Sequence, residues 1–302
     1  MNNRDMVVLI ILNYNDSDAT IRLVEAIRDY SSISKIVVVD NMSTDGSFET
    51  LKKLRLERVD VIQTSSNGGF ASGNNFGIRY AIEKYDAAYV IISNPDVEFE
   101  ETAVNAMQKA LEADTTVGIT APKMLNASGK AVKTAWKRPG FWACVSECFI
   151  VSNSIYNKLF GGEKSIESIS KERALVLQGS LFMISVAAYE SIGGMDEGTF
   201  LYYEENILAH RLFQHGFRER LITDFSYIHR RSESIDKSIR SERTKFNIQQ
   251  QSREYYCVKY LETGSAGILL LRTAFHIGLL NFMFCRGAQK KIKAITGKNA
   301  NR

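Results

Sequence analysis

Acidic residues follow an apolar run in the first third of the chain. Residues 89–92 are compact, apolar and mostly β-branched, which is typical of a strand buried on both faces. Pro95 cannot donate to a sheet ladder, so we expect the strand to end at about Asn94. Asp96 then follows the carboxyl end of a central strand, where open α/β sheets bind ligands. A carboxylate there, with further acidic residues up to Glu101, suits a hard cation that carries phosphates. A turn between a strand and a helix, with Asp96 as the helix cap, explains this pattern of residues equally well.

Polar side chains also follow the first two predicted strands. The apolar run 7–12 ends in Asn13-Tyr14-Asn15, and the run 36–39 ends in Asp40-Asn41. In a doubly wound sheet, these ends and the end at Asp96 meet at one crevice. The sequence therefore predicts a single ligand site at this edge.

A Gly-rich segment, residues 67–77, lies between the second and fourth strand positions. Its glycines would let backbone amides approach a nucleotide, and Asn74 and Asn75 could contact a base or ribose. A tight structural loop is an equally good interpretation. The segment is not the GxGxxG fingerprint, so a dehydrogenase fits badly.

The remaining pattern alternates strands with helices. Helices are expected at 19–30 and 102–113, and two more are expected to end at about residues 54 and 84. Further strands are expected at 59–63, 117–121, 175–185 and 227–229. This alternation predicts an α/β fold with a doubly wound, mostly parallel sheet. Residues 125–174 are less regular and include Trp136 and Arg138, which suit a loop over a ligand or an ordinary surface loop.

Charge is unevenly distributed along the 302 residues. The net charge is +4, but the chain has seven positive and no acidic residues after Glu262, which leaves −3 for the rest. The basic character therefore belongs to the C-terminal tail, which argues against a nucleic-acid partner and for an anionic surface.

An apolar segment, residues 266–285, precedes most of these charges. Arg272 within it disfavours a membrane-spanning helix, because a charge at the bilayer centre costs roughly 2.5–3.5 kcal/mol. A helix lying in the membrane interface fits better, and a buried helix is the alternative. The cysteines at 144, 148, 257 and 285 lack metal-type spacing, so we expect reduced thiols. No signal-peptide pattern begins the sequence, and a cytoplasmic location is expected.

Taken together, these motifs resemble a family 2 glycosyltransferase with the GT-A fold, in particular its rhamnosyltransferase-like branch. The resemblance covers residues 6–232 and rests on Asn13-Tyr14-Asn15, Val39 to Ser47, Asn67 to Gly77, Asn94-Pro95-Asp96, Gly179-Ser180, Gly193 to Glu197 and Phe200 to Glu205. It implies a Rossmann-like nucleotide-binding half and an acceptor half. It also implies that Asn13, Tyr14, Asn15, Asp40, Asn41, Gly69, Phe70, Asn74 and Asn94 bind the nucleotide. By the same resemblance, Asp96 and His229 bind a divalent metal, Mg²⁺ or Mn²⁺.

The resemblance places the catalytic base in an acidic turn. The family pattern is Glu-Asp, one spacer and Asp, whereas this chain has Glu204-Glu205-Asn206-Ile207. Glu205 stands at the base position with an extra methylene, and Glu204 is the alternative. Ile207 replaces the second Asp, which leaves open a catalytically impaired sugar-nucleotide-binding protein.

Three further residues are expected near the acceptor or diphosphate: Trp136, Arg138 and Arg211. Arg211 has the alternative role of holding the acidic turn.

The sequence thus predicts an inverting, metal-dependent transferase. The donor would be a dTDP- or UDP-sugar and the acceptor a lipid-linked or growing glycan of a surface polysaccharide, at the cytoplasmic membrane face. A nucleotidyltransferase is the enzymatic alternative, and a homodimer is left open. The expected divisions are a nucleotide-sugar half at 1–125, an acceptor half at 126–232 and a basic helical segment at 233–302.

Overall fold

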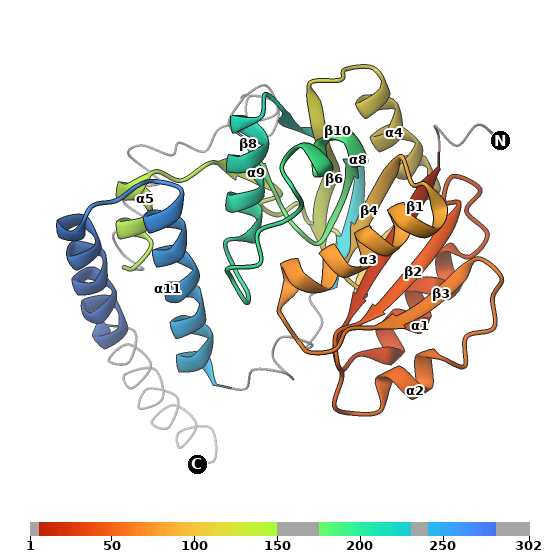
Figure 1. Cartoon of the computed structure of the whole chain (residues 1–302), viewed down its shortest axis with the longest axis horizontal. Coiled ribbons are helices and arrows are strands. Elements are labelled where there is room, and N and C mark those ends of the chain that lie inside the picture. Colours follow the sequence, from red (N-terminus) through yellow and green to blue (C-terminus); the bar gives the residue numbers. More distant parts are fainter. Residues whose placement is uncertain (1–5, 150–174, 231–240, 282–302) are drawn as a thin grey trace, which may run out of the picture. The chain divides into compact units, whose positions relative to one another are not determined.

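The computed structural model describes residues 6–149, 175–230 and 241–281. The chain forms two compact units. Unit 1 comprises residues 1–138 and 165–248, and unit 2 comprises 139–164 and 249–302. The described part of unit 1 contains the sheet, and that of unit 2 is helical (Figure 1).

The first half of unit 1 alternates strands and helices as predicted. Its elements are β1 (Val7–Asn13), α1 (Ser17–Ile27), β2 (Lys35–Asp40), α2 (Ser47–Leu51), β3 (Val59–Gln63), α3 (Phe70–Tyr85) and β4 (Tyr89–Ser93). β1 pairs in parallel with both β2 and β4, and β2 pairs in parallel with β3. The parallel order β3-β2-β1-β4 confirms the predicted βαβ units.

The second half of unit 1 completes an eight-stranded sheet of order β3-β2-β1-β4-β9-β6-β10-β5. Its elements are β5 (Val97–Phe99), α4 (Glu101–Glu112), β6 (Val117–Asn126), β7 (Ala135–Lys137), β8 (Leu175–Leu177), β9 (Leu181–Ser185), α8 (Val186–Ser191), α9 (Glu204–Gln214) and β10 (Arg218–His229). β9 is antiparallel to β4 and β6, and β5 is antiparallel to β10. The expected mostly parallel α/β sheet is therefore confirmed.

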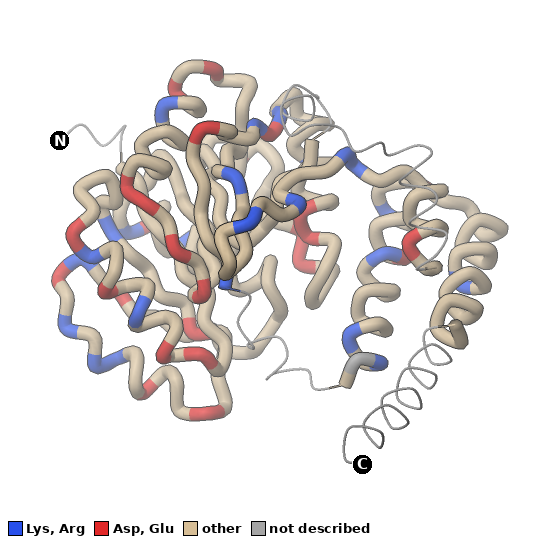
Figure 2. Tube along the Cα trace, turned by 180° about the vertical axis from the view of Figure 1, so that it is seen from behind, with Lys and Arg blue, Asp and Glu red and all other residues tan. Residues whose placement is uncertain are grey.

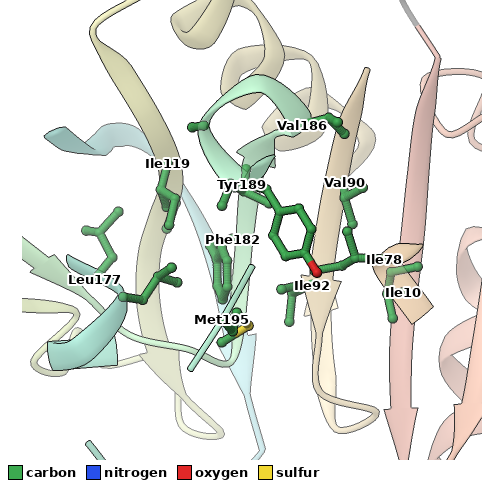
Figure 3. Close-up of a cluster of buried hydrophobic side chains, with 14 of the residues drawn as sticks. Ile10, Ile78, Val90, Ile92, Ile119, Leu177, Phe182, Val186, Tyr189 and Met195 are labelled. Atoms are coloured by element: carbon green, nitrogen blue, oxygen red, sulfur yellow. The ribbon is translucent and has the colours of Figure 1, made fainter. Parts of the chain in front are cut away.

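Alternating side chains of the strands build two cores, one on each face of the sheet. In β1, Val8 and Ile10 face the helix α3, whereas Leu9 and Ile11 face α1. This alternation follows from the period of two in a strand. Figure 3 shows the first core, where Tyr189 and Phe182 pack beside Ile92. Burial on both faces explains why these strands are apolar throughout.

Two expectations about the middle of the chain were wrong. The segment around Trp136 is a strand, β7, which pairs antiparallel with β8 in a separate two-stranded sheet. The single strand expected at 175–185 is two strands, β8 and β9, joined by a turn at 178–180. Gly179 allows this turn to pass close to α9, because a Cβ there would lie 2.9 Å from Glu205 Oε1.

Unit 2 gathers α5 (Phe141–Ser146) with the C-terminal helices. Tyr256 Oη, from α11 (Glu242–Lys259), donates to the Pro139 carbonyl at 3.1 Å. The buried Arg253 guanidinium donates to Cys148 Sγ at 3.3 Å and lies 3.4 Å from the Glu147 carboxylate. The described residues 139–149 thus belong to the same compact unit as the described C-terminal helices, and the expected acceptor half at 126–232 stays a prediction.

The structure describes three of the cysteines, all of them in unit 2. Cys144, Cys148 and Cys257 are buried and form no disulfide. Cys285 lies outside the described residues.

The last described helix, residues 265–281, has two apolar faces. Leu271, Ala274 and Phe275 are buried within the fold, whereas Leu269 and Leu280 are each 67% exposed. Among the described residues, no helix is long and apolar enough to cross a membrane. Arg272 lies opposite Glu254 of α11 at 2.5 Å, so its charge is balanced locally. The basic residues after position 281 lie outside the described residues.

Candidate active site

The ends of the first three strands share one buried carboxylate. Asn13 and Asp40 are register partners, and Asn13 Nδ2 donates to Asp40 Oδ1 at 2.8 Å. Asp40 Oδ2 accepts from the Ser43 backbone N–H at 3.0 Å and from Gln63 Nε2 at 2.9 Å. Both Asn13 and Asp40 are completely buried. Asp40 therefore holds the ends of β1, β2 and β3 together through three hydrogen bonds.

The loops after β1 and β2 are linked by two asparagines. Asn15 has a left-handed backbone (φ 53°), and its Oδ1 accepts from the Thr44 N–H at 2.8 Å. Asn41 Nδ2 donates to Asn67 Oδ1 at 3.0 Å and to the Gly69 carbonyl at 3.1 Å. The neighbouring Tyr14 is half-buried. The predicted nucleotide-binding residues of these loops are thus brought together.

The Gly-rich segment forms the beginning of α3. A Cβ on Gly69 (φ +91°) would lie 2.1 Å from the Phe200 carbonyl oxygen, and the Phe70 N–H donates to that oxygen at 3.1 Å. A Cβ on Gly77 would lie 2.7 Å from Ile10 of β1. Gly77 therefore serves helix–sheet packing, which corrects the interpretation that it admits a nucleotide. Asn74 is buried and donates to the Phe70 carbonyl at 2.9 Å.

The predicted metal residues meet at the other side of the same edge. Asp96 follows β4, and His229 ends β10 opposite Val97 of β5. His229 Nε2 lies 3.1 Å from Asp96 Oδ2, and their side chains are 15% and 7% exposed. No group of three or more His, Cys, Asp and Glu side chains arranged for a metal occurs among the described residues. The pair still fits Mg²⁺ or Mn²⁺, because such ions often take one or two protein ligands and complete their shell with substrate phosphates and water.

The acidic residues after Asp96 point to other partners. Glu98 forms an ion pair with Arg230, and Glu101 Oε1 accepts from the Ser32 N–H at 2.7 Å. The expectation that these residues support a cation beside Asp96 was therefore wrong, because strand alternation and the start of α4 turn them away. Acidic and basic positions are interspersed around unit 1 (Figure 2).

The turn at 178–180 connects the metal side to the acidic turn. The Asn94 N–H donates to the Ser180 carbonyl at 2.9 Å, and Ser180 Oγ lies 2.7 Å from the buried Tyr227 hydroxyl. The Gly179 N–H donates to Glu205 Oε1 at 3.2 Å. Sequence reasoning missed Tyr227, although its position two residues before His229 on one strand places both side chains on the same face.

Burial raises the pKa of the Tyr227 phenol, and the negative charges of Glu205 and Asp96 raise it further.

Glu204 and Glu205 differ in their surroundings. Glu204 is 5% exposed, and its Oε1 makes no hydrogen bond within the described residues. Burial and the adjacent charge of Glu205 raise the pKa of Glu204 to about 8. Glu205 keeps part of its surface open, and burial raises its pKa while the Gly179 N–H opposes that rise. Glu205 is thus the more exposed of the two carboxyl groups.

The segment that precedes the acidic turn, residues 192–197, is held by two side chains. Arg211 donates to the Gly194 carbonyl at 2.6 Å and to the Ile192 carbonyl. Asn75 donates to the Met195 carbonyl and to Glu197 Oε1, both at 2.8 Å. The structure thus gives these two side chains structural partners in residues 192–197, and the role of Arg211 stays a prediction.

The backbone just before α9 is strained. Tyr202 and Tyr203 are both in the left-handed region, with φ of 73° and 72°. Non-glycine residues there cost roughly 1–2 kcal/mol each, and such strain concentrates at functional sites.

The side of α9 facing β7 contains the last predicted residues. Trp136 Nε1 donates to Asn206 Oδ1 at 2.8 Å, next to Glu205 in sequence. The Arg138 guanidinium stacks over the Phe213 ring at 4.5 Å, two turns further along the helix. Ile207 is 1% exposed, so this chain has an apolar side chain at a dry position of the turn.

Solved glycosyltransferase structures share this architecture. A mannosyltransferase from Pyrobaculum calidifontis in complex with GDP-Man and Mn²⁺ has a TM-score of 0.56 at 16% identity, covering 95% of this chain and 80% of that one. A TarS structure from S. aureus in complex with UDP-GlcNAc has a TM-score of 0.53 at 12% identity. The match covers 92% of this chain and 73% of that one. The chain therefore has the GT-A fold of glycosyltransferases.

The sequence gives the family. Residues 8–190, more than half of the chain, match Glycosyl transferase family 2, and the chain belongs to this family. The expected family resemblance is confirmed.

Its relatives include sugar transferases from three organisms. A low-salt glycan biosynthesis hexosyltransferase of Haloferax volcanii is 28% identical over 68% of this chain, which spans 61% of that protein. An N-acetylglucosaminyl-diphospho-decaprenol L-rhamnosyltransferase of Mycobacterium tuberculosis is 25% identical, covering 67% of this chain and 68% of its own length. The rhamnosyltransferase WbbL of Escherichia coli is 24% identical, and the match covers 74% of this chain and 83% of that protein.

Proposed function

We propose that the chain is an inverting, metal-dependent glycosyltransferase of surface-glycan assembly. It moves a hexose or deoxyhexose from a nucleoside-diphosphate sugar to a lipid-linked or growing glycan. The observation that carries this proposal is the turn at 178–180, which accepts from the Asn94 N–H, two residues before Asp96, and donates to Glu205 through the Gly179 N–H. Such a connection fixes a diphosphate site and a base on one rigid frame, as displacement at a sugar carbon requires. Family membership supports sugar transfer over nucleotidyl transfer.

The base of this proposal is Glu205. Its carboxylate takes the proton of the acceptor hydroxyl as the acceptor oxygen bonds to the anomeric carbon and the bond to the nucleoside diphosphate breaks. Attack from the face opposite the leaving group inverts the configuration. The raised pKa of Glu205 strengthens it as a base, because a carboxylate with a higher pKa holds the abstracted proton more firmly. The Gly179 N–H orients the carboxylate.

The donor half uses the opposite end of the edge. Asp96 and His229 would hold the metal, which neutralises the diphosphate leaving group when bound. Asn13, Asp40 and Asn41 shape the pocket proposed for the nucleotide, and Tyr14 and Phe70 offer half-buried rings beside it. The relatives and fold neighbours act on or bind several different sugars and nucleotides, so this proposal takes dTDP- or UDP-sugars only as the first candidates.

The proposal includes work at the cytoplasmic face of a membrane. Support comes from the exposed apolar side chains of helix 265–281 and from the basic sequence that follows it. An apolar helix face beside positive charges binds anionic bilayers at their interface.

Two substitutions separate the halves of the site. Asp96→Asn should abolish metal-dependent binding of donor, because the amide is a poor ligand for a hard cation. Glu205→Gln should leave donor binding intact and lower transfer by roughly 10²–10⁴-fold, the usual contribution of a positioned base. Donor binding is measured by calorimetry with and without Mg²⁺ or Mn²⁺, and turnover by donor transfer or slow donor hydrolysis. Normal turnover by Glu205→Gln, or unchanged metal-dependent affinity in Asp96→Asn, would contradict the proposal.

A further inference from the structure

A third carboxyl group, Glu219, is buried beside the proposed base and has no role in the mechanism above. It lies in β10 immediately after an irregularity in the pairing of β10 with β6, where Arg218 pairs with Val117 and Glu219 pairs with Ile119. The side chain is 4% exposed. Its Oε2 accepts from the Leu177 backbone N–H at 2.6 Å. A buried acid with such a specific partner calls for a structural reason.

That reason lies in the edge of β8. On one side, β8 pairs with β7, and the Gln178 N–H donates to the Thr134 carbonyl at 2.9 Å. Because N–H groups alternate along a strand, the Leu177 N–H points to the other side, where it donates to Glu219. The chain then enters the turn at 178–180, which directs the Gly179 N–H to Glu205. The two carboxyls therefore receive donors from residues only two positions apart in the chain.

We propose that Glu219 is a positioning residue for the base: it holds the backbone edge from Leu177 to Gly179, so that the Gly179 N–H meets the Glu205 carboxylate. This inference deepens the proposed function, because it takes Glu205 as the base. Without Glu219, the Leu177 N–H would be buried without an acceptor and the edge would move to find one.

The charges around the pair are consistent with this role. Glu205 is surrounded by Glu204 on α9, by Glu219 and Tyr227 on β10, and by the Gly179 turn. Burial raises the pKa of Glu219 well above its ordinary value, and the negative charge of Glu205 raises it further. Both effects disfavour a second negative charge beside the proposed base. The Leu177 hydrogen bond needs only an oxygen acceptor, which the neutral acid also supplies.

The test compares Glu219→Met with Glu219→Gln. Met keeps the approximate volume but removes the acceptor, whereas Gln keeps a neutral oxygen acceptor. We expect the pKa of Glu205, followed by NMR titration of its labelled carboxyl, to rise by about one unit in Met and to stay unchanged in Gln. The rise follows because a weaker Gly179 hydrogen bond stabilises the ionised carboxylate less. In turnover assays, kcat of the Glu219→Met variant should fall about tenfold, and the acid limb of its pH–kcat profile should move to higher pH. The KM for the donor should not change.

Several results would overturn the proposal. An unchanged Glu205 pKa in a folded Glu219→Met variant would exclude positioning. A lower Glu205 pKa in both variants would show that Glu219 is charged. An equal loss of kcat in Glu219→Gln and Glu219→Met would mean that the carboxyl group of Glu219, and not only its oxygen acceptor, is required.

A second variant covers the case in which Glu219→Met does not fold. Gly179→Ala places a Cβ 2.9 Å from Glu205 Oε1 and leaves Glu219 intact. It should raise the Glu205 pKa and lower kcat in the same way, and a Gly179→Ala variant with parental values would refute the role of this contact. The titration is independent of turnover, so an inactive parent would count against the proposed function alone.

Discussion

Two neighbouring glutamates carry opposite tasks at the residue scale. Glu205 receives a backbone donor and keeps contact with solvent, which suits a group that must exchange a proton with a substrate. Glu204 is buried beside it with one oxygen lacking a hydrogen bond in the described structure. The neighbouring charge and the burial raise the Glu204 pKa to about 8. Ionisation of Glu204 at alkaline pH should therefore lower the stability of the fold.

This ionisation gives a pH-dependent prediction. The folded pKa of Glu204 lies above the ordinary value of 4.5, so its favourable contribution is complete below about pH 4.5 and is lost as the pH rises to about 8. Within that window, the free energy of unfolding should fall by up to about 1.4 kcal/mol per pH unit from this group alone. Glu204→Gln should flatten the decline. Urea unfolding at pH 5 and pH 8 measures both slopes, and equal slopes in parent and variant would show that Glu204 ionises normally in the fold.

At the scale of elements, the site depends on close approach between the start of α3 and the turn before α9. The Phe70 N–H bonds to the Phe200 carbonyl, and only a residue without a Cβ fits at Gly69. The same turn is anchored by Arg211 and Asn75 and contains the strained Tyr202 and Tyr203. The packing of neighbouring elements therefore maintains a backbone that the local sequence would not choose.

Gly69→Ala tests this contact. The added Cβ would lie 2.1 Å from the Phe200 oxygen, so α3 and the turn must separate. We expect a loss of unfolding free energy of about 3 kcal/mol or more, together with weaker donor binding. Gly129→Ala is the matched control: Gly129 also has a positive φ (+74°), but nothing lies within 4 Å of its added Cβ. It should cost only about 1–2 kcal/mol. Equal losses in urea unfolding would mean that backbone strain, and not the contact, explains both.

At the scale of the whole molecule, two compact units have different surfaces. Unit 1 buries its apolar residues on both faces of the sheet. In unit 2, one face of the helix 265–281 is buried, and the other leaves Leu269 and Leu280 exposed. The alternative of a buried helix therefore accounts for the inner face but not for the exposed one. A Cβ on Gly278 would lie 1.9 Å from the Cys148 carbonyl oxygen, so the inner face packs tightly against the end of α5.

The exposed face predicts binding to anionic vesicles. Leu269→Glu and Leu280→Glu should each reduce the vesicle-bound fraction by roughly tenfold, because each removes about 1.5–3 kcal/mol of apolar burial and adds a repelled charge. Phe76→Glu, at a 36% exposed position of α3, adds the same charge to unit 1 and should have little effect. Co-sedimentation with phosphatidylserine vesicles at low and high salt provides the measurement. A changed mass in light scattering with unchanged sedimentation would assign the face to a second copy of the chain instead.

The sequence alone determined the sheet, the family and the edge where the chemistry lies. Apolar runs such as 89–92 end in polar residues, and the parallel arrangement brings such ends together whatever the details of packing. Asp96 and Asp40 could be singled out for that reason, and Glu205 through the family resemblance of the acidic turn. The sequence could not show that Glu98 and Glu101 bond to other groups, because their partners Arg230 and Ser32 lie far away in the sequence.

Only the tertiary structure revealed how the two halves of the site are joined. The turn at 178–180 meets Asn94, Tyr227 and Glu205 through hydrogen bonds between residues up to 86 positions apart, and no local pattern encodes such pairs. The buried Glu219 reads in sequence as one more charged residue between two arginines. The structure shows Glu219 buried and bonded to the Leu177 N–H, because burial and hydrogen-bond direction are properties of the packed chain.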